Sequence, residues 1–338
     1  TRASTGTPSI SHKVLVLGQR LTTGTVAAAV PTRITNDGAA EASFGRGSML
    51  AEMLKAARKA NPYIELWGLA LDDDGAGVKA VGKLSFVASS VVAGTLNLYI
   101  GGKRVRVGVA ASATAAAIAT AAIAAINADT TLPVTAVVNG TNAYEVDLTC
   151  RWKGETGNAI DLRLNYYTGE ASPTGLTTTI TAMSTGTANP DVTDAIVAFG
   201  PEWWNYVVMP WMDTANLNAL AAEMVSRWGA MRAIDGIVFA AFRGTYGTTA
   251  SFGSARNDYP ISCMGTGASP TAPWIWAAVN ATVAADSLSN DPARPLRTLD
   301  LPGVLAPAVQ DRFIDEERNL LLFDGISTYE SRTDGTVA

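Results

Sequence analysis

Few side chains in this sequence can do acid–base or nucleophilic chemistry. Histidine occurs once, as His12, and a Ser-His-Asp triad or a Cys-His pair needs an imidazole to carry its proton. We expect His12 to pack beside the strand that follows it. A Ser-Lys pair does without histidine, so this exclusion is not complete. The sequence nevertheless predicts a protein that has no catalytic residue and is not an enzyme.

The two cysteines, Cys150 and Cys263, lie far apart in the chain. A zinc site needs several ligands at short spacing, and a disulfide framework needs more cysteines than two. We therefore predict two reduced thiols with a structural role, no metal ion and no cofactor.

Three consecutive aspartates, Asp72, Asp73 and Asp74, form the acidic run that is best able to bind a metal. They follow an apolar stretch that reads as a strand, and open α/β sheets bind their ligands at the carboxyl ends of strands. Three carboxylates could hold a magnesium ion. We favour a solvated acidic link, because no catalytic partner follows it. A second acidic run, Asp315-Glu316-Glu317, suits the first turn of a helix.

The first apolar stretch leads into Gly18-Gln19-Arg20-Leu21-Thr22-Thr23-Gly24-Thr25, where α/β proteins often carry a phosphate loop. The second glycine is one position late for the P-loop pattern, and no lysine follows it. The dinucleotide pattern G-x-G-x-x-G is also missed, so we predict no nucleotide site here.

Tryptophans occur in two close pairs, Trp203-Trp204 and Trp274 with Trp276. Exposed pairs of this kind can form a platform for a sugar ring. Both pairs adjoin apolar stretches, and this favours packing in a core or an interface.

Composition excludes some partners. The chain has 338 residues, 48% of them hydrophobic and 16% charged, with a net charge of -5. An acidic chain is a poor match for nucleic acid, which is bound by surplus Lys and Arg. The longest mainly apolar stretch, residues 115–126, is too short to span a bilayer, so we predict no membrane insertion. The chain opens with Thr1 rather than Met, and we expect a segment upstream of it.

The elements that would position these residues begin with a strand, a helix and a second strand. Residues 13–17 form a short apolar run closed by Gly18, and a helix beginning at Ser48 is ended by Asn61-Pro62. Residues 64–71 read as the next strand. Strand, helix and strand in this order are the unit of a parallel sheet.

The pattern then becomes β-rich between Val78 and Thr187. Two hairpin turns are predicted at Gly101-Gly102 and Asn139-Gly140. One alanine-rich helix is expected at residues 113–128. Strands are expected at residues 84–88, 95–100, 104–109, 134–138, 143–149, 160–165 and 177–181.

The first pattern resumes afterwards. Helices are expected at residues 192–199, from Thr214 as the cap to residue 228, and from Pro273 to residue 285. Strands are expected at residues 206–209, 236–241, 261–264 and 320–323. We predict an α/β fold, a doubly wound and mostly parallel sheet with an inserted β-rich α+β domain. Its parts are 1–77 and 188–338 for the core, and 78–187 for the insertion.

Several ordered stretches carry a family resemblance. In the core they are Lys13-Val14-Leu15-Val16-Leu17-Gly18-Gln19-Arg20-Leu21, Gly24-Thr25-Val26, Val30-Pro31-Thr32, Phe44-Gly45-Arg46-Gly47-Ser48-Met49-Leu50-Ala51 and Asn61-Pro62. In the β-rich part they are Gly94-Thr95-Leu96, Ile126-Asn127-Ala128, Leu132-Pro133-Val134, Lys153-Gly154-Glu155-Thr156-Gly157-Asn158 and Ile160-Asp161-Leu162. This order resembles the contractile bacteriophage tail sheath proteins of the Mu-like family over nearly the whole chain.

The resemblance implies a structural role in the virion, after assembly in the host cytoplasm. Family members have a core of subtilisin-like topology, here without a triad, and form hexameric rings stacked helically around a tail tube. Contraction drives the tube through the bacterial envelope. The implied partners are other copies of the chain, the tail tube protein, and baseplate and tail terminator proteins. Residues 78–187 would be the outer domain, the N-terminal strand-adding arm would be short or missing, and a C-terminal tube-facing domain would be absent.

Two alternatives remain open from the residues alone. One is an α/β hydrolase-like enzyme that uses an acidic metal site at Asp72, Asp73 and Asp74. The other is a secreted binding module that uses the inserted domain and its aromatic side chains.

Overall fold

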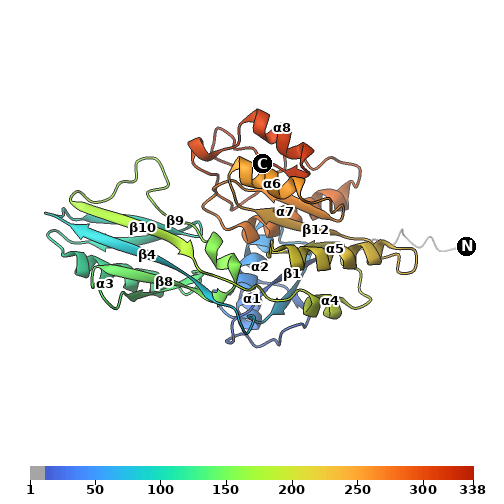
Figure 1. Ribbon diagram of the computed structural model, residues 1–338, viewed down its shortest axis with the longest axis horizontal. Coiled ribbons are helices and arrows are strands. Elements are labelled where there is room, and N and C mark those ends of the chain that lie inside the picture. Colours follow the sequence, from blue (N-terminus) through green and yellow to red (C-terminus); the bar gives the residue numbers. More distant parts are fainter. Residues whose placement is uncertain (1–11) are drawn as a thin grey trace, which may run out of the picture.

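Seven strands form the largest sheet of the computed structural model, which describes residues 12–338 (Figure 1). Their order is β14-β13-β12-β11-β1-β3-β2, and all neighbours are parallel except β2 and β3. The strands are β1 (Lys13–Gln19), β2 (Thr32–Ile34), β3 (Glu65–Leu71), β11 (Tyr206–Val208), β12 (Ile237–Phe242), β13 (Ile261–Gly265) and β14 (Ile326–Ser327). The mixed α/β fold that the sequence predicts is confirmed.

Helices cover this sheet. They are α1 (Asp37–Phe44), α2 (Met49–Ala60), α4 (Thr193–Phe199), α5 (Thr214–Trp228), α6 (Tyr246–Ser254), α7 (Pro273–Asn290) and α8 (Asp315–Phe323), with a short 3-10 turn at Val309–Asp311. Helices α2 and α7 pack against each other and on the central strands, and α4 packs on β3. Val14, Leu15, Val16 and Leu17 of β1 have no exposed surface. A strand that is apolar at successive positions is expected where both faces of a parallel sheet are covered.

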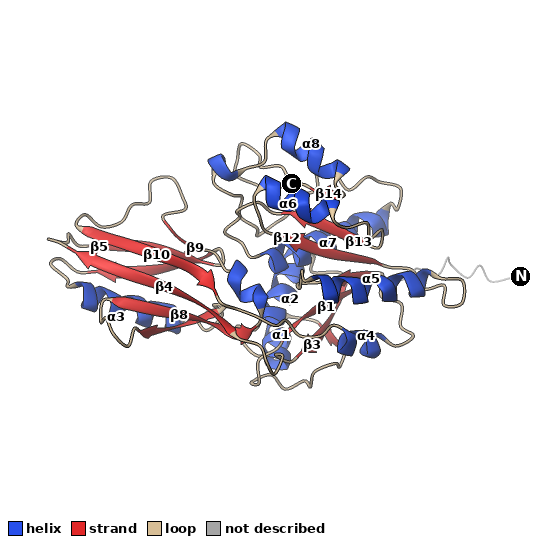
Figure 2. Ribbon diagram, in the orientation of Figure 1, coloured by secondary structure: helices blue, strands red, loops and turns tan. Residues whose placement is uncertain are grey.

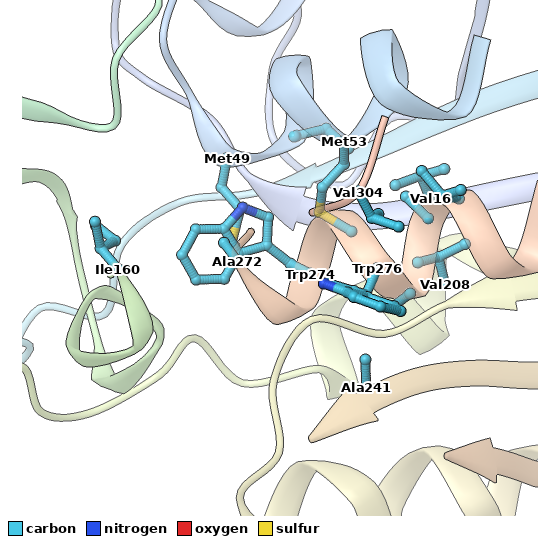
Figure 3. Close-up of a cluster of buried hydrophobic side chains, with 14 of the residues drawn as sticks. Val16, Met49, Met53, Ile160, Val208, Ala241, Ala272, Trp274, Trp276 and Val304 are labelled. Atoms are coloured by element: carbon cyan, nitrogen blue, oxygen red, sulfur yellow. The ribbon is translucent and has the colours of Figure 1, made fainter. Parts of the chain in front are cut away.

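Close contacts fix α2 on the sheet. A Cβ atom at Gly18 would lie 3.0 Å from the Cβ of Leu50, and one at Gly68 would lie 2.9 Å from the Cδ1 of Leu54. These glycines therefore let helix and strand approach each other. Figure 3 shows Trp276 of α7 lying among apolar side chains such as Val16 and Val208.

The β-rich part forms two further sheets, with orders β10-β4-β8-β7 and β6-β5-β9. Its elements are β4 (Lys79–Ala88), β5 (Gly94–Ile100), β6 (Lys103–Val109), α3 (Ala115–Ala128), β7 (Val134–Val138), β8 (Glu145–Lys153), a 3-10 turn at Glu155–Ala159, β9 (Leu162–Leu164) and β10 (Leu176–Ser184). Helix α3 packs against strands of both sheets. Residues of β8 alternate between buried and half-buried, the pattern of a strand with one face on a core.

Both predicted hairpins are confirmed. Strands β5 and β6 pair antiparallel across Gly101 and Gly102, which have φ angles of 56° and 84°. Positive φ at both central residues matches the twist of the strands and is easily adopted by glycine. Strands β7 and β8 pair across the loop that holds Asn139 and Gly140.

The β-rich part leaves and re-enters the core at one place. Val78 and Thr187 form an antiparallel bridge, with N···O distances of 3.1 and 3.3 Å between their backbones. Figure 2 shows this part extending away from the main sheet, on the side where the strand arrowheads of β1 and β3 point.

Two predictions about individual elements are wrong. Residues 320–323 belong to helix α8 rather than to a strand, and the last strand is β14. A short apolar run has no period that separates a helix from a strand. Thr214 is the first helical residue of α5, and the cap is Asp213, whose side chain accepts a hydrogen bond from the backbone N–H of Asn216 at 3.0 Å.

The remaining expectations fall in three groups. The other expected helices and strands are present, with ends shifted by a few residues, while strand β2 and helices α1 and α6 were not expected. Among residues 12–338, no helix is long and apolar enough to cross a bilayer. The expected N-terminal arm falls on residues 1–11 and lies outside the described part of the chain.

Candidate functional site

His12 lies directly before β1 and has a structural partner. Its Nδ1 atom is 2.9 Å from the hydroxyl of Tyr206, and the two ring centres are 5.7 Å apart. Burial raises the pKa of the Tyr206 hydroxyl to about 12, so it stays protonated at neutral pH. This pair joins β1 to β11 by packing and one hydrogen bond.

The loop after β1 uses its backbone N–H groups internally. The N–H groups of Arg20, Leu21, Gly24 and Thr25 donate to carbonyl oxygens at 2.9 to 3.1 Å. A Cβ atom at Gly24 would lie 2.6 Å from the carbonyl oxygen of Ser43, so this glycine is required by close packing. A phosphate loop needs free N–H groups that point at the ligand. The loop is therefore built for packing.

The three aspartates after β3 bind separate protein groups. Asp72 accepts two hydrogen bonds from Arg20, at 2.6 and 3.1 Å, and Asp74 accepts one from the backbone N–H of Ala76 at 2.7 Å. Asp73 accepts from Gln19 Nε2 at 2.8 Å and from the backbone N–H of Lys153 at 3.1 Å. Burial raises the pKa of Asp73, and these two hydrogen bonds oppose that shift. Within residues 12–338, no group of three or more His, Cys, Asp or Glu side chains is placed to hold a metal ion.

The second acidic run has the role that the sequence predicts. Asp315, Glu316 and Glu317 form the first turn of α8, and Glu317 accepts the backbone N–H of Ile314 at 3.0 Å. Negative charge is favoured at this end of a helix.

Three of the four paired tryptophans are buried and cannot stack on a sugar. Trp204 packs edge to face on Trp67 at 5.6 Å, and Trp276 donates to Ser269 Oγ at 3.0 Å. Trp274 is also buried. Trp203 alone of the four is exposed, and its indole N–H donates to the carbonyl oxygen of Asp235 at 2.7 Å.

Both cysteines are buried free thiols, as the sequence predicts. Burial raises the pKa of Cys150 and of Cys263 to about 12. Neither side chain is a ready nucleophile, because the thiolate is the reactive form.

The carboxyl ends of the parallel strands meet the β-rich part, and aromatic rings form the centre of this junction. Trp152 of β8 packs edge to face on Trp274 of α7, with ring centres 5.7 Å apart. Figure 3 shows Met49 and Ala272 beside the Trp274 ring. Open α/β sheets bind ligands at this edge. Here the protein's own β-rich part packs against this edge.

Polar groups at strand ends complete the junction. Gln19, at the end of β1, is fully buried and donates to the carbonyl oxygen of Lys153 at 2.7 Å. Arg243, directly after β12, pairs with Asp161 at 2.6 Å. Buried polar groups need such partners, since an unpaired one costs stability.

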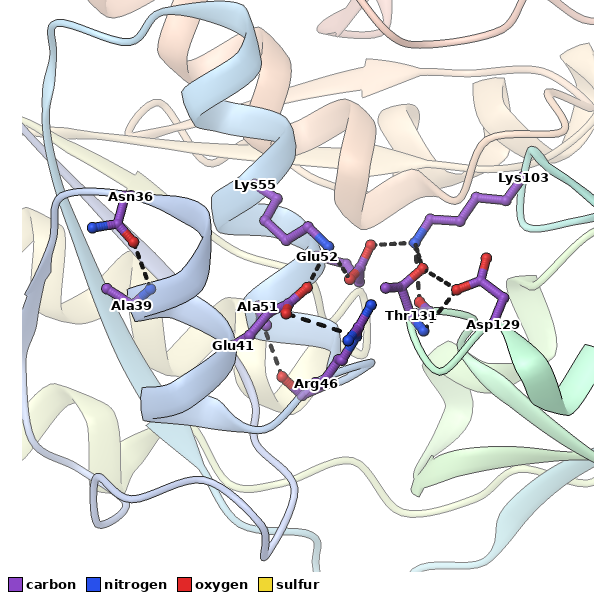
Figure 4. Close-up of polar contacts among 11 residues, drawn as sticks. Asn36, Ala39, Glu41, Arg46, Ala51, Glu52, Lys55, Lys103, Asp129 and Thr131 are labelled. Atoms are coloured by element: carbon purple, nitrogen blue, oxygen red, sulfur yellow. Dashed lines mark hydrogen bonds and ion pairs between the residues drawn. The ribbon is translucent and has the colours of Figure 1, made fainter.

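An ionic network links α2 to the β5–β6 hairpin (Figure 4). Glu52 is nearly buried, and its carboxylate binds both Lys55, at 3.0 Å, and Lys103 of the hairpin. Lys103 also donates to the backbone and side-chain oxygens of Thr131, at 3.0 and 3.1 Å. Lys55 binds Glu41 of α1 at 2.8 Å. The hydrogen bond from Lys55 lowers the pKa of Glu41.

The sequence predicts a packing role for Trp274 but does not indicate which residues meet it at this junction. Gln19, Glu52, Lys103 and Trp152 are separated by up to 133 residues, so no local spacing joins them. The available signal was Glu52 on the otherwise apolar face of α2, where a charged residue needs a partner.

Comparisons with known proteins agree on one family. The model of the phage tail sheath protein central domain matches residues 185–338. The FluMu tail sheath protein of a Mu-like prophage of Haemophilus influenzae is 45% identical over 329 residues, which is 97% of this chain and 67% of the relative.

Two solved structures are also similar to this chain. The sheath tail protein Lin1278 from Listeria innocua is 13% identical with a TM-score of 0.45, and the match covers 98% of this chain and 68% of that one. The sheath tail protein DSY3957 from Desulfitobacterium hafniense is 12% identical with a TM-score of 0.44, covering 100% and 72%.

The extent of identity to the Haemophilus influenzae protein decides the assignment, because it runs through both the main sheet and the β-rich part. The junction residues described above give the strand ends a packing role rather than a chemical one. The chain belongs to the phage tail sheath protein family, with a Mu-like relative, and is a structural component of a phage tail rather than an enzyme.

Proposed function

We propose that copies of this chain form hexameric rings that stack helically around a tail tube, and that contraction of this sheath drives the tube through the bacterial envelope. The observation that carries the proposal is the 45% identity to a tail sheath protein over 97% of the chain. This identity favours a sheath protein over the two alternatives, which are a hydrolase with a metal site at Asp72, Asp73 and Asp74 and a secreted binding module.

Physical arguments support this role. Identical subunits that meet through different surfaces generate rings or open helices. A contracting assembly needs subunits that change neighbours while they keep their own shape. The contacts of Trp152, Glu52 and Asp161 hold the β-rich part on the core, which supports a subunit that keeps its shape.

The partners and location follow from the same proposal. They are other copies of the chain, the tail tube protein, and baseplate and tail terminator proteins. Assembly takes place in the host cytoplasm, and the finished sheath is part of the virion.

The proposal includes a division of the chain. Residues 1–77 and 188–338 form the sheath core, of doubly wound and subtilisin-like topology, and residues 78–187 form an inserted outer domain. The order of the parallel strands and the bridge between Val78 and Thr187 support this division.

Electron microscopy of the purified protein and of phage tails tests the proposed role. Rings or tubes that contain this chain are the expected result. Dispersed particles under all conditions, with the chain missing from purified tails, would contradict it.

Deletion of the β-rich part tests its outer position. Residues 79–186 are removed, and Val78 is joined to Thr187 by a short Gly-Ser linker, which their bridge makes feasible. We expect assembly to persist. A second version also carries Trp274→Ser, because the deletion uncovers this ring, and circular dichroism checks that each core folds. Loss of assembly by a folded core would place this part at an inner or inter-ring contact.

A further inference from the structure

A groove with a mainly basic lining lies beside the ionic network of α2. It is formed by α2, the turn of the β5–β6 hairpin, the start of α7 and the loop at Gly303, and its volume is about 460 Å³. Ile275 of α7 gives it one apolar wall. We call it the basic groove. Its charged side chains are Lys55, Arg58, Lys59 and Lys103 on one hand and Asp37 and Glu52 on the other.

Two of the basic side chains have no carboxylate partner among residues 12–338. Glu52 binds the other two, as Figure 4 shows. Arg58 donates to backbone carbonyl oxygens only, and its Nε–H is buried without a hydrogen-bond partner. Lys59 forms no ion pair or hydrogen bond with this part of the chain. Asp37 can offset only one of these two charges, so the groove keeps positive charge that a partner could neutralise.

The matching negative charge protrudes from α8. Its first turn, residues 315–317, is entirely acidic, and the side chain of Asp315 is 94% exposed. Arg318 of the same helix pairs with Asp315, but Glu316 is exposed and has no partner among residues 12–338. Ile314, directly before the turn, is 60% exposed. An acidic turn flanked by an apolar side chain complements the basic groove with its apolar wall.

The basic groove and the acidic turn lie on different parts of one chain. Helix α2 packs on α1 and α7, while α8 packs on α6 and on β14, the strand at the end of the sheet. Figure 1 shows α8 well apart from α2. Each copy therefore carries both halves of a contact on separate surfaces, and such a contact joins copies head to tail. Head-to-tail contacts generate rings or open helices.

The charge of the whole chain favours a second copy over a phosphate polymer. The net charge is -5, so a long polyanion such as nucleic acid would be repelled by the rest of the surface. A single exposed turn brings its negative charge to the groove alone.

We propose that the acidic first turn of α8 in one copy docks in the basic groove of a neighbouring copy, where Glu316 pairs with Lys59 and Arg58. The inference rests on the proposed function, in which copies of the chain form rings that stack helically, and it names one contact between them.

Charge reversal in cells that produce the phage tests this contact. Lys59→Glu and Glu316→Lys each place like charges across it, so each alone should lower the number of sheathed tails seen by electron microscopy at least about tenfold. The double variant restores an opposite pair. The two single variants expressed together do so as well, because the reversed groove of one fits the reversed turn of the other. We expect sheathed tails to return in both cases.

A matched control and a folding check accompany these variants. Arg106→Glu makes the same change in net charge as Lys59→Glu, at an exposed position of β6 in the β-rich part. It should leave the number of sheathed tails unchanged. Circular dichroism of each purified variant shows whether the chain still folds.

Thiol cross-linking in wild-type-like tails measures the same contact directly. Lys59→Cys and Glu316→Cys are combined in one chain, while Cys150 and Cys263 are buried and stay unmodified. A short bismaleimide should join the copies into a ladder of covalent multimers. Either cysteine alone should give no ladder, because the contact joins two different surfaces.

Normal tail assembly by the folded single variants would overturn the proposal. So would a loss caused by Lys59→Glu that Glu316→Lys does not repair, since the groove would then hold a different partner, such as a phosphate group. The proposed function stands in both cases as long as the wild-type chain is found in sheathed tails. If the wild-type chain is missing from them, the proposed function fails as well, and the two failures are thus told apart.

Discussion

The two edges of the main sheet carry the same kinds of residue in opposite states. At the carboxyl edge, Trp274 packs on Trp152 and is removed from water. At the amino edge, Trp228 is 63% exposed. Residue type alone does not decide burial; the presence of a second packed unit does. At the carboxyl edge the packed β-rich part covers the aromatic side chains. Within residues 12–338, no such unit covers Trp228 at the amino edge.

Charges follow the same division. At the carboxyl edge, ion pairs such as Glu52 with Lys103 and Asp161 with Arg243 cross from the core to the β-rich part. At the amino edge, the pair of Arg232 with Glu223 joins neighbouring elements within the core. Pairs that cross an interface hold two units together, and local pairs only neutralise a surface. Mutations at the two edges should therefore differ in their effect on stability.

Trp274→Ala should give the largest effect. Removing this ring leaves a cavity against Trp152, and buried Trp→Ala changes cost about 3–5 kcal/mol. Urea unfolding, followed by circular dichroism, measures the loss. A change in the free energy of unfolding below about 1 kcal/mol would mean that the junction is loosely packed. The two edges would then not differ in how tightly their aromatic side chains are packed.

Glu52→Gln should give the next largest effect. The nearly buried carboxylate binds Lys55 and Lys103. Hydrogen bonds to charged groups contribute about 1.5–3 kcal/mol to the stability of a fold. Glu316→Gln is the matched control, because Glu316 is exposed in the first turn of α8. Equal effects of the two substitutions in urea unfolding would show that the network does not stabilise the junction.

Glu41→Gln should have a smaller effect that depends on pH. The hydrogen bond from Lys55 holds the pKa of Glu41 below its ordinary value of 4.5. A lowered carboxyl pKa stabilises the fold above the unfolded pKa, and this stabilisation is lost as pH falls through the folded value. At pH 7 the free energy of unfolding of the wild type should exceed that of the variant by at most about 1 kcal/mol, because the pair is partly exposed. This difference should disappear as the pH is lowered. A difference that stays constant with pH would show that it does not arise from the lowered pKa of Glu41.

The sequence predicts most of the fold because its strands are short, apolar and closed by turn residues. Helices α1 and α6 escape prediction for a physical reason. Helix α6 contains two glycines and two threonines, which are poor helix formers, and it forms where buried Thr249 packs in the core. Helix α1 has weak apolar periodicity, and Asn36, which caps it, was its one clear signal.

The junction could not be predicted in the same way. Trp152 and Trp274 are far apart in the sequence, and only the pairing of the strands brings the two regions together. The exposed aromatic residues at the amino edge, such as Trp203, Trp228 and Tyr259, are of the same kind. They occupy separate loops and helix ends, and they share one edge because the strands that follow them are parallel.

Trp228→Ala should have the smallest effect on the free chain. The side chain is largely in water, so its removal leaves no cavity, and surface substitutions usually change stability by no more than about 0.5 kcal/mol. Its cost should appear only when a partner is present, because contacts at the centre of an interface often contribute about 2 kcal/mol or more to binding. Urea unfolding of the free chain and incorporation of the variant into tails measure the two quantities separately. A large loss of stability in the free chain would mean that Trp228 supports its own fold. Normal incorporation with normal stability would mean that no partner covers Trp228 in tails. The amino edge would then remain exposed in the assembled tail as it is in the free chain.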